Sequence, residues 1–71
     1  MVKLTRLRHI RERRALTQQE LAAKAGISRV AVVRIESGLS EPYPRTVRAL
    51  AEALGVEPHE LMEPDPSLVA A

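Results

Sequence analysis

Two arginines enclose two valines in the segment GISRVAVVRIESG, residues 26–38. Arg29 and Arg34 each supply a charged, planar fork of hydrogen-bond donors, which suits acceptors that lie in a fixed geometry. Val30 and Val33 are poor choices for a helix surface exposed to water, although the segment has the apolar pattern of a helix. We therefore expect something other than water to face these side chains.

Other reactive residue types are scarce. The chain contains no cysteine, and its two histidines, His9 and His59, lie far apart in the sequence. Neither a glycine-rich phosphate loop nor a paired-carboxylate motif is present. The sequence therefore predicts neither an enzyme nor a metal site, and it implies no cofactor.

Charge is distributed unevenly along the 71 residues. The first 48 residues carry all eleven lysines and arginines against four acids, a local net charge of +7, whereas the last 23 carry five acids and no lysine or arginine. This polarity favours a basic end that faces a polyanion and an acidic end that faces away. Charge alone leaves a second explanation open, a solvated arginine-rich surface.

The elements that position these side chains are all predicted to be helices. Apolar residues at helical spacing predict a first helix over residues 3–14. The sequence Thr17-Gln18-Gln19-Glu20 has the form of a capping box, so a second helix is expected to start at Thr17 and to end at Gly26. Glycine and proline signals then place three further helices at about residues 28–37, 44–54 and 57–62.

The length allows one small domain, which we assign to residues 1–62. The tail, residues 63–71, contains two prolines and is expected to be flexible or to take part in a dimer. No run of about 18 apolar residues and no apolar signal core occur, so we expect a cytosolic protein.

These motifs together resemble the phage-repressor type of helix-turn-helix family, which includes lambda repressor and Cro-like regulators. The matching residues are Arg11, LTQQELA (16–22), AGIS (25–28), RIESG (34–38), Pro42 and LAEALGV (50–56). The match covers about residues 4–62. It implies an all-α fold, a compact five-helix bundle whose third helix lies in the DNA major groove while the second crosses the backbone.

The resemblance makes the outward face of the third helix a surface that reads bases. Thymine methyl groups would contact Val30 and Val33, and guanine O6 and N7 would accept hydrogen bonds from Arg29 and Arg34. The helical wheel alone turns Val32 inward and the same four residues outward. Two alternatives stay open for the valines: ordinary exposed residues, or contacts with another protein.

The resemblance also implies contacts with DNA phosphates and one ion pair. The predicted phosphate contacts are Gln18, Ser28, Ser37, Tyr43 and Arg45. Gln18 would be assisted by the positive end of its helix, or would be exposed without a partner. The Tyr-Pro insertion puts Arg45 in doubt, and Tyr43 could instead cover the bundle. Arg11 and Glu36 are expected to form a partly buried salt bridge between the first and third helices.

The function implied is sequence-specific binding of double-stranded DNA by a transcriptional regulator, a repressor that acts as a homodimer on an inverted-repeat operator. An apolar end formed by Leu61, Met62, Leu68 and Val69 could supply the dimer contact. The alternative function is a protein-interaction module, such as an antitoxin that binds a toxin or an adaptor, with secondary DNA binding. Arg29 and Arg34 would be dispensable for the alternative.

Overall fold

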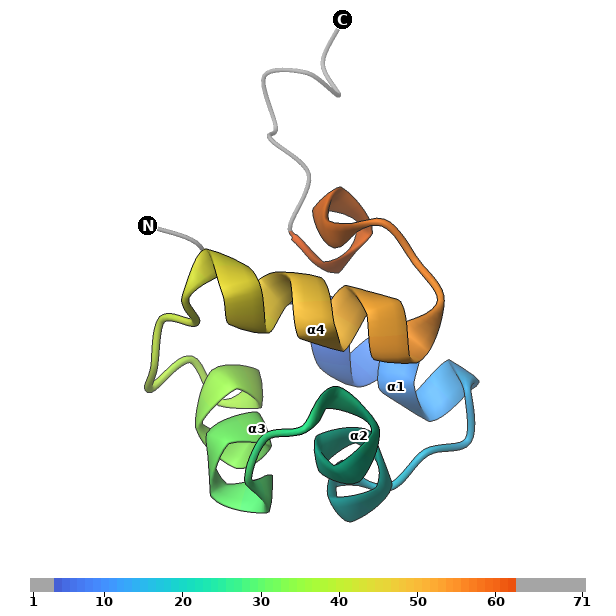
Figure 1. Cartoon of the computed structure of the whole chain (residues 1–71), viewed down its shortest axis with the longest axis horizontal. Coiled ribbons are helices and arrows are strands. Elements are labelled where there is room, and N and C mark those ends of the chain that lie inside the picture. The colour runs from blue at the N-terminus through green and yellow to red at the C-terminus, as the bar shows by residue number, and fades with distance from the viewer. Residues whose placement is uncertain (1–3, 63–71) are drawn as a thin grey trace, which may run out of the picture.

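The computed structural model describes residues 4–62 and folds them into helices, with no strand in that part of the chain. Four α-helices are followed by one turn of 3-10 helix: α1 (Leu7–Arg13), α2 (Gln18–Ala25), α3 (Arg29–Glu36), α4 (Pro44–Leu54) and η1 (Pro58–Leu61). In Figure 1, α4 crosses above α2 and α3, and α1 lies behind it. The all-α prediction is confirmed.

Capping residues fix the ends of α2. The Thr17 hydroxyl accepts a hydrogen bond from the Glu20 amide at 3.0 Å, and the Glu20 carboxylate accepts one from the Thr17 amide at 2.9 Å. Both halves of the predicted capping box are therefore formed. Gly26 ends the helix in the left-handed region at φ 73°, where a glycine has no steric penalty.

The turn between α2 and α3 is short, and α3 has its own cap. The Ser28 hydroxyl accepts a hydrogen bond from the Ala31 amide at 3.1 Å, so α3 begins at Arg29. Only three residues, 26–28, separate the two helices, which keeps α3 at a fixed position beside α2.

The first helix is shorter than predicted. It begins at Leu7 rather than Lys3, because Arg6 occupies the N-cap position without a side-chain hydrogen bond. A turn closed by the Leu7 amide and the Leu4 carbonyl, 3.0 Å apart, precedes it. After α1, Ala15 adopts a left-handed backbone conformation at φ 57°, although it is not a glycine.

The prediction of five helices is wrong, because the fifth element is not an α-helix. Residues Pro58–Leu61 form a single 3-10 turn. The Met62 backbone then leaves the helical region at φ −93° and ψ 153°, so no second turn follows. An isolated single turn commonly uses the tighter 3-10 hydrogen bonds, as between the Glu60 amide and the Glu57 carbonyl at 2.9 Å.

The core draws residues from every element. Its buried apolar side chains are Leu4, Leu7, Leu21, Ala22, Val32, Ile35, Val47, Leu50, Ala51, Leu54 and Leu61. Val32 and Ile35 are the contribution of α3, and their burial fixes which face of that helix is turned away from the core.

Two kinds of feature are absent from residues 4–62. No helix there has the length and apolar character needed to cross a bilayer. Nor do those residues bring together three or more histidine, aspartate or glutamate side chains in a metal-binding arrangement.

Candidate nucleic-acid interface

The outward face of α3 carries all four residues predicted to read bases. Val30 is 58% exposed and Val33 37% exposed, and Arg29 and Arg34 are exposed as well. These four side chains therefore lie on one surface, which we call the α3 face. The arrangement is the one that the helical wheel predicts, since the opposite side of α3 is buried in the core.

The two arginines of the α3 face are free to bind a ligand. Among residues 4–62, the ion pairs join Arg8 to Glu12 and Arg11 to Glu36, so neither Arg29 nor Arg34 takes part in one. Their guanidinium forks therefore remain available to external acceptors, beside two valines that offer methyl groups. A surface with both kinds of contact matches the polar edges and methyl groups of base pairs.

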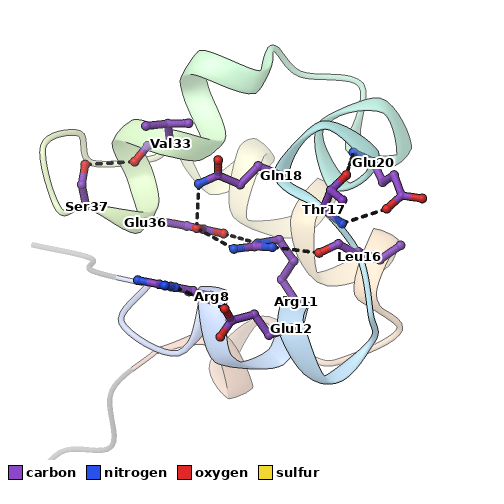
Figure 2. Close-up of polar contacts among 10 residues, drawn as sticks. All are labelled: Arg8, Arg11, Glu12, Leu16, Thr17, Gln18, Glu20, Val33, Glu36 and Ser37. Carbon is purple, nitrogen blue, oxygen red and sulfur yellow. Dashed lines mark hydrogen bonds and ion pairs between the residues drawn. The ribbon is translucent and has the colours of Figure 1, made fainter.

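Arg11 and Glu36 hold α3 against α1. The Arg11 Nε donates to the Glu36 Oε2 at 2.6 Å, and its Nη2 donates to Oε1 at 3.1 Å, which is a two-point contact (Figure 2). The Arg11 Nη1 donates to the Leu16 carbonyl at 2.8 Å. Hydrogen bonding to the Glu36 carboxylate raises the pKa of Arg11, so the pair favours the charged form of the guanidinium. The end of α3 is thereby fixed.

Gln18 joins this network, which the sequence did not indicate. Its Nε2 donates to the Glu36 Oε1 at 3.1 Å, so one carboxylate binds side chains from both α1 and α2 (Figure 2). One N–H of the Gln18 amide is used in this way, and the second is left to donate to a phosphate. Contact between Gln18 and phosphate stays a prediction.

The two predicted serine contacts differ in what their hydroxyl groups already do. The Ser28 hydroxyl accepts the Ala31 amide, so its own proton is free to be donated to a phosphate. The Ser37 hydroxyl donates to the Val33 carbonyl at 2.9 Å and lies 3.2 Å from the Arg34 carbonyl. Its single proton is therefore engaged, and a phosphate contact would require the hydroxyl to rotate.

Tyr43 and Arg45 lie together at the start of α4. The Tyr43 ring is not part of the core, because the residue is 69% exposed. The Arg45 guanidinium carbon lies 5.6 Å from the ring centroid, a cation–π contact that restricts where this charge can move. The sequence analysis considered each residue alone and did not predict the stacking.

Leu39 is an exposed residue that the sequence analysis missed. It is 81% exposed in the connection between α3 and α4, and its amide donates to the Arg34 carbonyl at 2.9 Å. The sequence around Leu39, three residues before Pro42, carries no local signal that this leucine is exposed. Its position beyond the last turn of α3 became evident only from the fold.

Comparison with known proteins identifies the helix-turn-helix family to which the chain is similar. A helix-turn-helix family model matches residues 7–61. The transcriptional repressor RghR of Bacillus subtilis is 44% identical over 57 residues, which cover 79% of this chain and 42% of RghR. The chain thus spans less than half the length of that relative.

Solved structures of two regulators are also similar. The restriction-modification controller protein C.AhdI of Aeromonas hydrophila is 36% identical with a TM-score of 0.79, covering 82% of this chain and 88% of that one. The P22 c2 repressor, solved in complex with a synthetic operator, is 29% identical with a TM-score of 0.80, covering 92% of this chain and 98% of that one. The chain belongs to the phage-repressor type of helix-turn-helix family, whose members are DNA-binding transcriptional regulators.

Proposed function

We propose that the chain reads a specific sequence in double-stranded DNA by placing α3 in the major groove. The observation that carries this proposal is the α3 face, where two arginines that form no ion pair within residues 4–62 enclose two exposed valines. Arg29 and Arg34 donate to guanine O6 and N7, and Val30 and Val33 contact thymine methyl groups. The P22 c2 repressor, a similar structure, was solved bound to an operator.

The predicted phosphate contacts lie at the starts of α2, α3 and α4 and at the end of α3. Gln18 and Ser28 stand at the starts of α2 and α3, where each retains a proton to donate. At the start of α4, Tyr43 supplies a hydroxyl group, and Arg45 supplies a guanidinium that is positioned by its cation–π contact with the Tyr43 ring. Ser37 is the weakest of the five, because its hydroxyl proton is bonded internally.

The regulator acts as a homodimer on an inverted repeat in this proposal, because one domain of this size contacts few bases. An apolar groove of about 250 Å³ supports a contact with a second copy, and it is lined by Pro42, Pro44, Val47, Arg48, Pro58 and Met62. Of the four residues predicted for the dimer contact, Leu61 is unsuitable because it is fully buried in its own core. Met62 lines the groove, and Leu68 and Val69 lie outside the described residues.

The experiment that tests the proposal is selection of bound duplexes from a random-sequence DNA pool at near-physiological salt. An enriched inverted repeat would support both sequence reading and the dimer, and its half-site spacing is expected to be about one helical turn, roughly 34 Å. An enriched single half-site would support reading without dimerisation. Weak, salt-sensitive binding with no enriched sequence would contradict the proposal.

A second candidate function is the protein-interaction module, an antitoxin or adaptor. The residue on which this function would rest is Leu39, whose large apolar side chain is 81% exposed and offers a contact to a partner protein. This function predicts that Leu39→Ser abolishes partner binding while Arg29→Ala leaves it unchanged. The regulator function predicts that Arg29→Ala weakens affinity for duplex DNA and that Leu39→Ser leaves it nearly unchanged.

A further inference from the structure

A cleft separates α1 from the segment that joins α4 to η1, on a side of the molecule that the α3 face does not include. Its volume is about 240 Å³. The lining residues come from α1 and from the chain around η1, and none comes from α2 or α3. In Figure 1, α3 lies at the lower left and the connection from α4 to η1 at the right. We call this feature the α1–η1 cleft.

Both ends of the cleft are held by hydrogen bonds. At one end the Arg6 amide donates to the Leu61 carbonyl at 3.2 Å, which joins the start of α1 to the end of η1. At the other end the Arg14 Nε donates to the Leu54 carbonyl at 3.0 Å, which joins the chain after α1 to the end of α4. These two contacts join the walls of the cleft in the folded protein.

The side chains of the cleft are mainly basic. Arg6, Arg13 and Arg14 line it together with His9, and Glu60 is the single acid among its lining residues. The Glu60 carboxylate already accepts a hydrogen bond from the Glu57 amide at 2.7 Å. This hydrogen bond partly compensates the negative charge of the carboxylate. Three guanidinium groups against one carboxylate leave the cleft positively charged.

We propose that the α1–η1 cleft binds a multiply charged oxyanion of the phosphate type, at a site separate from the α3 face. Arginine forks match the oxygen geometry of phosphate groups and can bind them through two hydrogen bonds each. Ile10 and Val56 supply the apolar part of the lining, against which the arginine side chains can pack their aliphatic stems. Free pyrophosphate or nucleotide phosphates and a duplex backbone share this chemistry.

The test is the thermal stability of the full chain with increasing sodium pyrophosphate, against sodium chloride of equal ionic strength. Mass action predicts that Tm rises by roughly 5 to 10 °C at a concentration about ten times the Kd. The double variant Arg6→Ala/Arg13→Ala should lose this increase, because both side chains are exposed and line the cleft. A wild-type Tm that responds to pyrophosphate no more than to chloride would overturn the proposal.

Two controls locate the effect. Arg8→Ala changes an exposed arginine of α1 that does not line the cleft, so the pyrophosphate response should persist. Arg29→Ala removes a charge from the α3 face and should leave the response intact as well. If Arg29→Ala abolishes the response and the double variant does not, the anion binds at the α3 face and the proposal is wrong.

The salt dependence of affinity for duplex DNA distinguishes the two sources of the oxyanion. If a duplex backbone fills the cleft, the double variant lowers the slope of log K against log salt by about 2, one for each lost phosphate contact. An unchanged slope, together with the pyrophosphate response, assigns the cleft to a free oxyanion. Because the thermal test uses no DNA, it stands even if the proposed sequence reading fails.

Discussion

Arg11 of α1 has surroundings opposite to those of the two arginines of α3, Arg29 and Arg34. Arg11 of α1 is 9% exposed and donates hydrogen bonds to Glu36 and to the Leu16 carbonyl. Arg29 and Arg34 of α3 are exposed, and neither forms an ion pair within the described chain. The same residue type therefore stabilises the architecture at Arg11 and remains available for a ligand at Arg29 and Arg34. Residue type alone does not separate these roles, but burial and partners do.

The energetics of the two settings also differ. A charge removed from water is costly unless a partner compensates for it, so Arg11 and Glu36 depend on each other. An exposed arginine keeps its hydration and contributes little to folding, which leaves its interaction energy for binding. Variants in the two regions should therefore change different measurements, stability for the network around Glu36 and affinity for the α3 face.

The largest effect is expected from Glu36→Ala. This change leaves Arg11 without its carboxylate in a poorly solvated position and also removes the acceptor of Gln18, so unfolding free energy should fall by about 3–5 kcal/mol. Chemical denaturation measures it. The matched control is Glu12→Ala, which breaks an exposed ion pair with Arg8 and should cost at most about 0.5 kcal/mol. An unchanged Tm for Glu36→Ala would refute the structural role of the pair.

Arg29→Ala tests the other side of the comparison. Loss of a two-point contact with guanine should weaken specific DNA binding by about 1–3 kcal/mol, or roughly 5- to 150-fold, and relax preference at one base pair. Stability should stay within about 0.5 kcal/mol, as for other surface changes. Titration against the selected duplex and its single-base variants measures both. Equal losses on every sequence would place Arg29 on a phosphate instead.

Thr17→Ala should destabilise the helix that carries Gln18. The change removes the hydroxyl that accepts the Glu20 amide, and N-cap losses of this kind cost about 1 kcal/mol. Urea denaturation measures the effect. Gln19→Ala, an exposed change one residue away from the capping pair, should be close to neutral. If the two variants are equally stable, the capping box makes no contribution.

Ala15→Gly should stabilise the protein, by about 0.5–1 kcal/mol. The left-handed conformation at φ 57° costs an alanine more than a glycine, and this relief exceeds the extra freedom that glycine gives the unfolded chain. Ala23→Gly is the matched control, because Ala23 is an exposed residue within α2, where glycine costs about 1 kcal/mol. A lower Tm for Ala15→Gly would contradict the predicted strain.

Glu20→Gln should have the smallest effect, visible only in acid. The Thr17 amide donates to the Glu20 carboxylate and lowers its pKa below the ordinary value of 4.5. This contribution is present above the unfolded pKa and is lost as pH falls through the lower folded pKa. Glutamine keeps the hydrogen bond without a titration, so the variant should lose less stability than the native chain below pH 4.5. If the stabilities of the variant and the native chain fall in parallel as pH decreases, the ionisation of Glu20 does not contribute to stability.

The sequence predicted the helix boundaries well where the signal was local. Thr17 with Glu20, Ser28, Gly26 and Gly55 each act within four residues of their own position. Both ends of α2, the start of α3 and the end of α4 lie where these residues indicate. The α3 face also followed from the sequence, because burial on one side of a helix repeats with its period.

The remaining features could not be predicted, either because they join residues far apart in the sequence or because no residue marks them locally. The hydrogen bond from Gln18 to Glu36 joins two helices, and the Arg14 contact with the Leu54 carbonyl spans 40 positions, so no local pattern announces either one. The first helix was predicted too long because no capping residue marks its start. The α1–η1 cleft is formed by two regions that lie more than 40 positions apart in the sequence, so it could not be inferred before the fold was known.

The burial of Leu61 has a consequence for folding during synthesis. Its side chain is fully buried among residues from the other helices, and its carbonyl binds the Arg6 amide, which lies 55 positions earlier. A nascent chain that has not yet exposed Leu61 from the ribosome has an open core and an unpartnered start of α1. Folding during synthesis is therefore expected to wait for this last turn, although α2 and α3 have already emerged.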